Sequence, residues 1–419
     1  MRPLTRALVL AAALLAALAP LAAAAPADSA VLFIGDGMGA AQIAMARGAA
    51  GGDPLAMERL PYSGLVTTHS ASHRITDSAA AGTALATGRK TNNGMVSVLP
   101  DGTRLETILQ RALRAGKSVG VVTTDALTGG TPAPFLAHVA DRGERAEIAA
   151  QLVQSGAHVM LGFWRADFLP QGAGGRRTDG RNLVAELRRR GYDVVFTRQE
   201  LADSQNLAIV GLFDDGEHAP TLAEMTTAAL ARLSVNAQGF LLVVEGARID
   251  WACHSNDPAG SVIETWALDE AVAAAAEFAR QRGRTLVLVT ADHETGGLRI
   301  EHPNRLPALR GVRGDSAAIA SHLNADRTNV GATLAEHAGI RDITLAEADR
   351  VRAASTAAAG IAALLSERAG VSWTTTGHSA APVPIYALGP GAERFTGQMD
   401  NTDIPSRIAQ LLRLGEFPR

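Results

Sequence analysis

Two motifs in the sequence place a carboxylate and imidazoles at spacings that suit a metal ion. In Asp250-x-x-x-His254 the two side chains are four residues apart, so one turn of helix would put both on the same face. A third ligand would come from His378 in the run Thr-Thr-Gly-His-Ser. One carboxylate and two imidazoles with an open position form a normal zinc site. We therefore predict that Asp250, His254 and His378 hold zinc.

A second zinc site is predicted around a serine. Its ligands would be Asp36, the adjacent pair Asp292 and His293, and the oxygen of Ser78. A change from strand to loop at residues 290–297 would let the neighbouring Asp292 and His293 turn towards one ion. Ser78 begins a predicted helix, where exposed backbone N–H groups and the helix dipole favour phosphate. Zinc coordination would favour the serine alkoxide, which makes Ser78 a candidate nucleophile.

Oxygen ligands define a third predicted site. Asp36, Thr131 and Glu245 would offer only oxygen atoms, which suits magnesium with several retained waters. Arg142 follows Thr131 by eleven residues, and its guanidinium group could bind two phosphate oxygens. Hydrolysis of a phosphate monoester needs a nucleophile, charge neutralisation on the nonbridging oxygens and a stabilised leaving group. Together the candidate residues could supply all three.

These motifs resemble the alkaline phosphatase family over roughly residues 30–410 and occur in the family's order. The positions that match are Asp36, Ser78, Thr131, Arg142, Glu245, Asp250, His254, Asp292, His293 and His378. The resemblance implies an alkaline phosphatase, a phosphomonoesterase with a phosphoserine intermediate, two zinc ions and one magnesium ion per chain. By analogy alone it also implies a homodimer.

Two positions differ from better-known members of that family. Gly129 stands where Asp or His is frequent near the third metal, and Trp251 stands where Lys or His is frequent. A glycine offers no side chain to the ion or its waters, so we expect a weaker magnesium site. On that basis Gly129→Asp is expected to strengthen it.

Other functions have to be weighed against this one. A phosphodiesterase or sulfatase on the same scaffold would use Thr, or a modified Cys in a Cys-x-Pro-x-Arg pattern, whereas this chain has Ser78 and lacks that pattern. A phosphate- or metal-binding protein without turnover would need neither Ser78 nor Arg142. More simply, Ser78 could be only a helix cap, although Thr76 or Asp77 suits that role better. Arg142 could be a surface ion pair.

Short apolar runs that alternate with amphipathic segments predict the elements that position these residues. The order is typical of an α/β fold with one mainly parallel sheet covered by helices on both faces. Strands are expected at 30–34, 119–123, 158–161, 193–196, 207–212, 240–244, 285–290 and 383–388. Helices are expected at 105–115, 144–154, 181–190, 222–233 and 262–280. Asp36, Glu245 and Asp292 each follow a strand, where such sheets bind their ligands.

The remaining features concern domains and location. Residues 1–25 contain Arg2 and Arg6, an apolar run and then small residues, which is typical of a signal peptide. That apolar run is too short for a membrane span. Residues 26–419 are expected to form one catalytic domain, with a helical and loop insertion at about 299–372. This domain is expected in the periplasm or secreted.

The net charge of the chain is −3, which gives no sign of a basic surface for binding nucleic acid. Cys253 is the only cysteine and is predicted to be a buried structural thiol.

Overall fold

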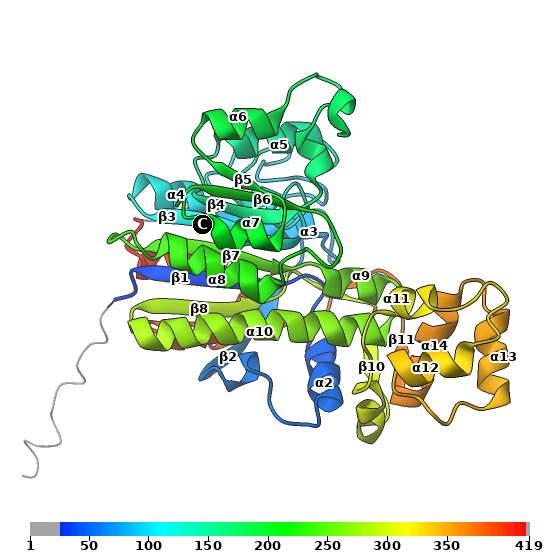
Figure 1. Cartoon of the computed structure of the whole chain (residues 1–419). Helices are drawn as coiled ribbons and strands as arrows, with labels where there is room; N and C mark the ends of the chain where they lie inside the picture. Colours follow the sequence, from blue (N-terminus) through cyan, green and yellow to red (C-terminus); the bar gives the residue numbers. More distant parts are fainter. Residues whose placement is uncertain (1–25, 416–419) are drawn as a thin grey trace, which may run out of the picture.

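A ten-stranded sheet forms the centre of the computed structural model, which describes residues 26–415 (Figure 1). The strand order is β14-β2-β13-β8-β1-β7-β3-β4-β6-β5. The strands of this sheet are β1 (Ser29–Gly35), β2 (Tyr62–Thr67), β3 (Ser118–Ala126), β4 (Val159–Phe163), β5 (Asp193–Val195), β6 (Ile209–Phe213), β7 (Phe240–Gly246), β8 (Thr285–Thr290), β13 (Val383–Leu388) and β14 (Gly397–Asp400). The predicted α/β fold with a mainly parallel sheet is confirmed.

The central strands are parallel and end at a common rim. β1 pairs with β7 on one side and with β8 on the other, so that Ile34 lies opposite both Glu245 and Thr290. Asp36 and Asp292 follow directly beyond these strands. Glu245 is still inside β7, one residue beyond the predicted end of that strand. Parallel strands of this kind gather side chains from distant segments at their carboxyl ends.

Helices that connect or follow the strands cover the sheet. They are α2 (Ala40–Ala49), α3 (Ser78–Thr87), α4 (Ile108–Arg114), α5 (Arg145–Gln154), α6 (Leu183–Arg189), α7 (Arg198–Asp203), α8 (Leu222–Leu233), α9 (Arg248–His254), α10 (Pro258–Arg282) and α15 (Asp403–Leu411). α8 and α10 cross the near face of the sheet in Figure 1. The connections from β6 to β7 and from β7 to β8 cross the sheet in one direction, whereas β1, β3 and β4 follow one another in the other direction. Because such crossovers are right-handed, α4 and α5 lie on the face opposite to α8 and α10.

Local sequence explains the longest of these helices. Asp257 caps the start of α10 by accepting a hydrogen bond from the backbone N–H of Ala259, and Pro258 occupies the first helical position. Gly283, with φ of +70°, ends the helix in the left-handed conformation. An acidic cap, an early proline and a final glycine are the expected signals for such boundaries.

Two strands at one edge of the sheet lack the pattern that predicted the others. β2 is mostly exposed and has a glycine in its centre, and β14 is four residues long. β13 joins β2 and β8 in antiparallel fashion, so this edge is mixed. Exposed strands at or next to an edge need no continuous apolar run, which is why the sequence did not indicate β14, at the edge, or β2 beside it.

The segment at 299–372 extends beyond one end of the sheet in Figure 1. It contains α11 (Ser316–Ser321), α12 (Val330–His337), α13 (Leu345–Ala353) and α14 (Ala357–Ala369). Its apolar residues form a second buried cluster, which also takes in Met45 of α2 and Val262 of α10. Helices and loops make up most of this segment. None of the helices within 26–415 is long and apolar enough to cross a membrane.

Candidate active site

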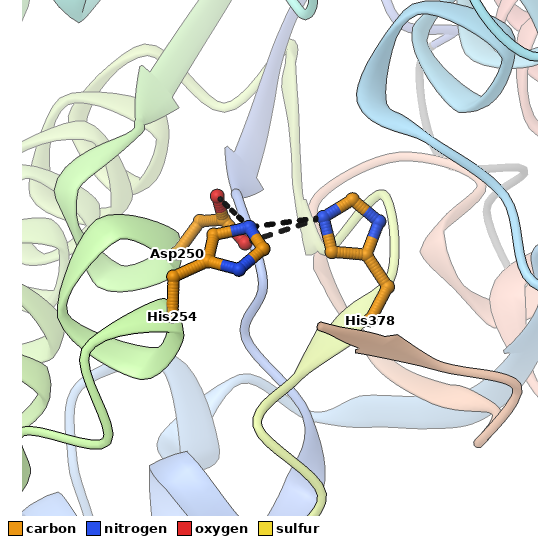
Figure 2. A group of neighbouring side chains, drawn as sticks. All are labelled: Asp250, His254 and His378. Atoms are coloured by element: carbon orange, nitrogen blue, oxygen red, sulfur yellow. Dashed lines mark hydrogen bonds and ion pairs between the residues drawn. The ribbon is translucent and has the colours of Figure 1, made fainter. Parts of the chain in front are cut away.

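One metal-ligand trio is assembled from α9 and a short strand on the other side of the site. Asp250 and His254 share one face of α9, and His378 approaches from β12 (His378–Ser379) (Figure 2). The Nε2 atom of His254 lies 3.2 Å from Asp250 Oδ2 and 3.2 Å from His378 Nε2. His378 Nε2 is also 3.8 Å from Asp250 Oδ1. The three predicted ligands therefore converge on one point.

Backbone carbonyl groups fix the orientation of both histidines. Nδ1 of His254 lies 2.6 Å from the carbonyl oxygen of Thr376, and Nδ1 of His378 lies 2.8 Å from that of Thr76. A carbonyl oxygen only accepts, so both Nδ1 atoms carry a proton and both Nε2 atoms face the site. Without a metal, the hydrogen bond to Asp250 raises the pKa of His254 to about 9. A cation there would replace that proton, and the donor set fits zinc.

A two-stranded ladder brings His378 into place. β12 pairs antiparallel with β9 (Glu294–Thr295), which sets His378 opposite Thr295. The Thr295 hydroxyl donates to Asp250 Oδ1 at 2.5 Å and lies 3.2 Å from His293 Nδ1. Strands of two residues leave no periodic pattern, so the sequence predicted His378 through its motif and not through this ladder.

The second cluster surrounds His293, which is fully buried. Its Nε2 atom lies 3.2 Å from Asp292 Oδ2, 3.6 Å from Asp36 Oδ1 and 3.3 Å from Ser78 Oγ. Ligand atoms of Asp36, Asp250 and His293 also lie within 4.8 Å of one another, so Asp250 borders both clusters. The structure thus brings all the predicted ligands of the second site together.

Two carboxylate oxygens in this cluster are buried without a hydrogen-bond partner among residues 26–415. They are Asp36 Oδ1 and Asp292 Oδ2. Burial, and then the neighbouring carboxylates, raise the pKa of Asp36 well above its usual range and that of Asp292 to about 7. Burial lowers the pKa of His293 well below its usual range, which keeps its ring neutral. Buried carboxylate oxygens without hydrogen-bond partners, beside a neutral imidazole, are the surroundings expected for a bound cation.

Ser78 is the first residue of α3 and its side chain is buried beside His293. The cap of the helix is Asp77, whose Oδ1 accepts from the backbone N–H of Ala80 at 3.0 Å. Asp77 therefore provides the capping role that could have explained Ser78. The Ser78 hydroxyl is left facing the metal-ligand cluster at a helix N-terminus.

Arg142 is held at the edge of the same site by two contacts. Its Nη1 donates to Asp77 Oδ2 at 3.0 Å, and its backbone N–H donates to the carbonyl of Gly94 at 2.7 Å. The guanidinium group passes so close to Gly130 that a side chain there would collide with it. Arg142 is thus paired with the residue that precedes Ser78, and not with an acid elsewhere on the surface.

The third cluster lies between β1, β7 and the loop after β3. Thr131 Oγ1 donates to Asp36 Oδ2 at 3.2 Å, and the hydroxyl of Thr123 donates to Glu245 Oε2. Burial, followed by the nearby Asp125, raises the pKa of Glu245 to about 8. The oxygen donors predicted for magnesium are therefore adjacent, and burial disfavours their negative charge unless a cation offsets it.

Three residues that contribute to the site were missed in the sequence. Asp77 binds Arg142, Thr123 binds Glu245, and the Asp125 carboxylate fills the space where a side chain at Gly129 would lie. From the sequence we expected no side chain near the third cluster at the position of Gly129. The Asp125 carboxylate lies in that space and corrects this expectation. A signal existed, because Asp125 follows the predicted strand 119–123 by two residues, just as Asp36 follows its own strand.

Comparisons with known proteins identify the class. An α/β sheet with a serine and clustered candidate metal ligands at its carboxyl rim is typical of a metal-dependent hydrolase. Residues 27–414 match the alkaline phosphatase family, and the chain belongs to that family of phosphomonoester hydrolases. It is 35% identical to alkaline phosphatase 4 of Bacillus subtilis, over 92% of this chain and 89% of that protein.

Solved structures agree with this assignment. The alkaline phosphatase of Thermus thermophilus has a TM-score of 0.84 and 31% identity, with 94% of this chain and 93% of that chain covered. A cold-active enzyme of the same kind from a psychrophilic Shewanella has a TM-score of 0.82 and 32% identity, covering 92% of this chain and 99% of that one. The predicted family and enzyme class are confirmed.

Proposed function

We propose that this chain is an exported phosphomonoesterase that acts through a phosphoserine at Ser78, with two zinc ions and one magnesium ion. The observation that carries the proposal is the position of Ser78 Oγ, 3.3 Å from His293 Nε2 at the start of α3. A serine that served only as a helix cap would have no reason to face buried metal ligands.

In the proposed reaction, Ser78 Oγ attacks phosphorus while the bond from phosphorus to the ester oxygen breaks, and the alcohol leaves. Arg142, oriented by Asp77, would bind nonbridging oxygens of the phosphoryl group. Water then attacks the phosphorus of phosphoserine, which restores the Ser78 hydroxyl and releases phosphate. When bound, zinc would act as a Lewis acid that makes hydroxyl groups more acidic and stabilises negative charge.

The residues that would hold each metal follow from the three clusters. Asp250, His254 and His378 would bind one zinc ion. The second zinc ion would be bound by Asp36, Asp292 and His293 together with Ser78. Asp36, Thr131 and Glu245 would bind magnesium, because hard oxygen donors suit that ion.

Trapping of the covalent intermediate tests this proposal. The purified protein is mixed with a radiolabelled phosphate monoester and quenched in acid, alongside Ser78→Ala and the exposed control Ser321→Ala. We expect stoichiometric labelling of the wild type and the control, none in Ser78→Ala, and a loss of turnover by several orders of magnitude. Labelling of Ser78→Ala at the wild-type level would refute the role of Ser78.

Substrate choice separates the remaining functions. We expect p-nitrophenyl phosphate to be hydrolysed much faster than bis-p-nitrophenyl phosphate or p-nitrophenyl sulfate, and this activity to depend on zinc. Faster cleavage of the diester or sulfate would favour the alternative activities, and tight phosphate binding without turnover would favour a binding protein.

Export rests on residues 1–25, which lie outside the described part of the chain. N-terminal sequencing of protein from the periplasm or medium would test cleavage near residue 25.

A further inference from the structure

The carboxylate of Asp125 is placed beside the third cluster by the irregular end of β3. β3 pairs with β7 as far as Thr123 opposite Glu245, and its register with β4 shifts between Val122 and Ala126. An irregularity of this kind redirects side chains at the end of a strand. The backbone N–H of Asp125 donates at 2.9 Å to Thr123 Oγ1, and the same hydroxyl donates to Glu245. The backbone of Asp125 and the side chain of Glu245 are therefore hydrogen-bonded to the same hydroxyl group, that of Thr123.

Asp125 and a side chain at residue 129 cannot occupy the same space. A Cβ atom built on Gly129 would lie 2.7 Å from Asp125 Oδ2 and 2.9 Å from the carbonyl oxygen of Ala126. Contacts this short require the neighbouring atoms to move. The glycine is thus the residue that makes room for the Asp125 carboxylate.

No partner within residues 26–415 accounts for the other oxygen of this carboxylate. Asp125 Oδ1 is shielded from solvent and has no hydrogen bond in that part of the chain. Arg142, Arg145 and Arg248 are near enough to act on Asp125 electrostatically. Each of the three forms its ion pair elsewhere, Arg142 with Asp77, Arg145 with Asp167 and Arg248 with Asp215.

The surroundings of Asp125 point to a cation. Asp36 and Glu245 are buried, and Asp36 has an oxygen without a hydrogen-bond partner in the described residues. Asp125 is partly buried, and its carboxylate adds to their repulsion unless positive charge compensates it. Magnesium prefers carboxylate and hydroxyl oxygens and the water molecules that they orient.

We propose that the Asp125 carboxylate serves the third cation site in place of a side chain at residue 129, together with Asp36, Thr131 and Glu245. This inference rests on the third cation of the proposed function. It makes Asp125 a positioning residue or a ligand of that cation, it shares only Asp36 with the proposed zinc sites, and it does not involve Ser78.

Magnesium binding provides the test. Calorimetric titration of magnesium into the dialysed, zinc-loaded protein is compared for the wild type, Asp125→Ala and Asp125→Asn. Loss of such a group typically weakens metal binding about 10- to 100-fold, and we expect that loss in both variants while zinc content stays unchanged. Asp214→Ala is the control, because Asp214 is exposed, pairs with Arg165 and removes the same charge.

Moving the carboxylate from residue 125 to residue 129 gives a second comparison. In contrast to the expectation from the sequence, Gly129→Asp alone should weaken magnesium binding, because its side chain would collide with Asp125. The double variant Asp125→Ala/Gly129→Asp should bind more tightly than Asp125→Ala, since the space is then free. Wild-type magnesium affinity in Asp125→Asn would overturn the proposal, as would loss of zinc along with magnesium or failure of the double variant to recover. Phosphoserine trapping with zinc alone reports on the proposed function separately.

Discussion

The imidazole of His378 is hydrogen-bonded through Nδ1 to the carbonyl oxygen of Thr76, at 2.8 Å. Thr76 lies two residues before Ser78, so this bond joins a predicted zinc ligand to the loop that carries the proposed nucleophile. The opposite ring nitrogen of His378 faces His254 and Asp250. A change in metal occupancy at this histidine is therefore expected to affect the position of the start of α3.

Removal of His378 should release one zinc ion. His378→Ala leaves only Asp250 and His254 at that site, and zinc sites normally need at least three protein ligands. Metal analysis after dialysis should find about two zinc ions per chain in the wild type and about one fewer in the variant. His322→Ala, which removes a histidine of the insertion stacked on His337, is the control. Wild-type zinc content in His378→Ala would disprove the assignment.

Zinc uptake by the metal-free protein should strengthen as pH rises from 7 to 9. The pKa of His254 is raised to about 9 by its hydrogen bond to Asp250, so below pH 9 zinc must displace a proton from this ring. Above the pKa the proton is already gone and that contribution ends. Calorimetry at pH 8 in buffers of different ionisation enthalpy should show proton release. An affinity that stays constant between pH 7 and 9 would contradict this prediction.

Replacement of Asp77 should weaken phosphate binding. Asp77 accepts hydrogen bonds from Arg142 Nη1 and from the backbone N–H groups of Ala80 and Gly94. Asp77→Asn keeps a capping oxygen but removes the charge that orients Arg142. Hydrogen bonds to charged groups are worth about 1.5–3 kcal/mol, so inhibition by inorganic phosphate should weaken by about tenfold or more. The melting temperature should change more in Asp77→Ala, which also loses the helix cap.

Cys253 should be inert in the native protein. Its thiol is fully buried between Gln42 and Ser261, and burial raises its pKa to about 12. A thiol reagent at pH 8 should therefore react only after denaturation, with one equivalent per chain. Cys253→Ala should keep the wild-type zinc content. Loss of zinc in that variant would instead show that the sulfur is a ligand.

The sequence predicted the fold well where a repeated pattern was present, and the motifs named residues that lie close together in the structure. Continuous apolar runs indicated the buried parallel strands, and Asp36 and Asp292 lie at the rim where strand ends placed them. β2, the second strand from the edge, was not predicted, because a half-exposed strand lacks such a run. Contacts between distant loops could not be predicted, since they depend on how the strands are ordered in space.

The neighbours of Gly129 illustrate that limit. The glycine alone predicted a weakened magnesium site, because only the residue at that position was considered. The carboxylate that fills the space comes from Asp125 at the irregular end of β3. A substitution at one position and its compensation at another are visible together only once the chain is folded.

The two-residue ladder between β9 and β12 also sets the order in which the site can be completed. Thr76 and His378, which it brings into contact, are 302 residues apart in the chain. During synthesis the start of α3 emerges long before β12, so a growing chain has its serine but lacks the last histidine. Under the proposed zinc assignment, stable capture of the ion at Asp250 and His254 would then wait until almost the whole chain is available. A fragment that ends before β12 would retain Ser78 and the central strands but lack His378, and we expect it to be inactive ahead of the complete chain.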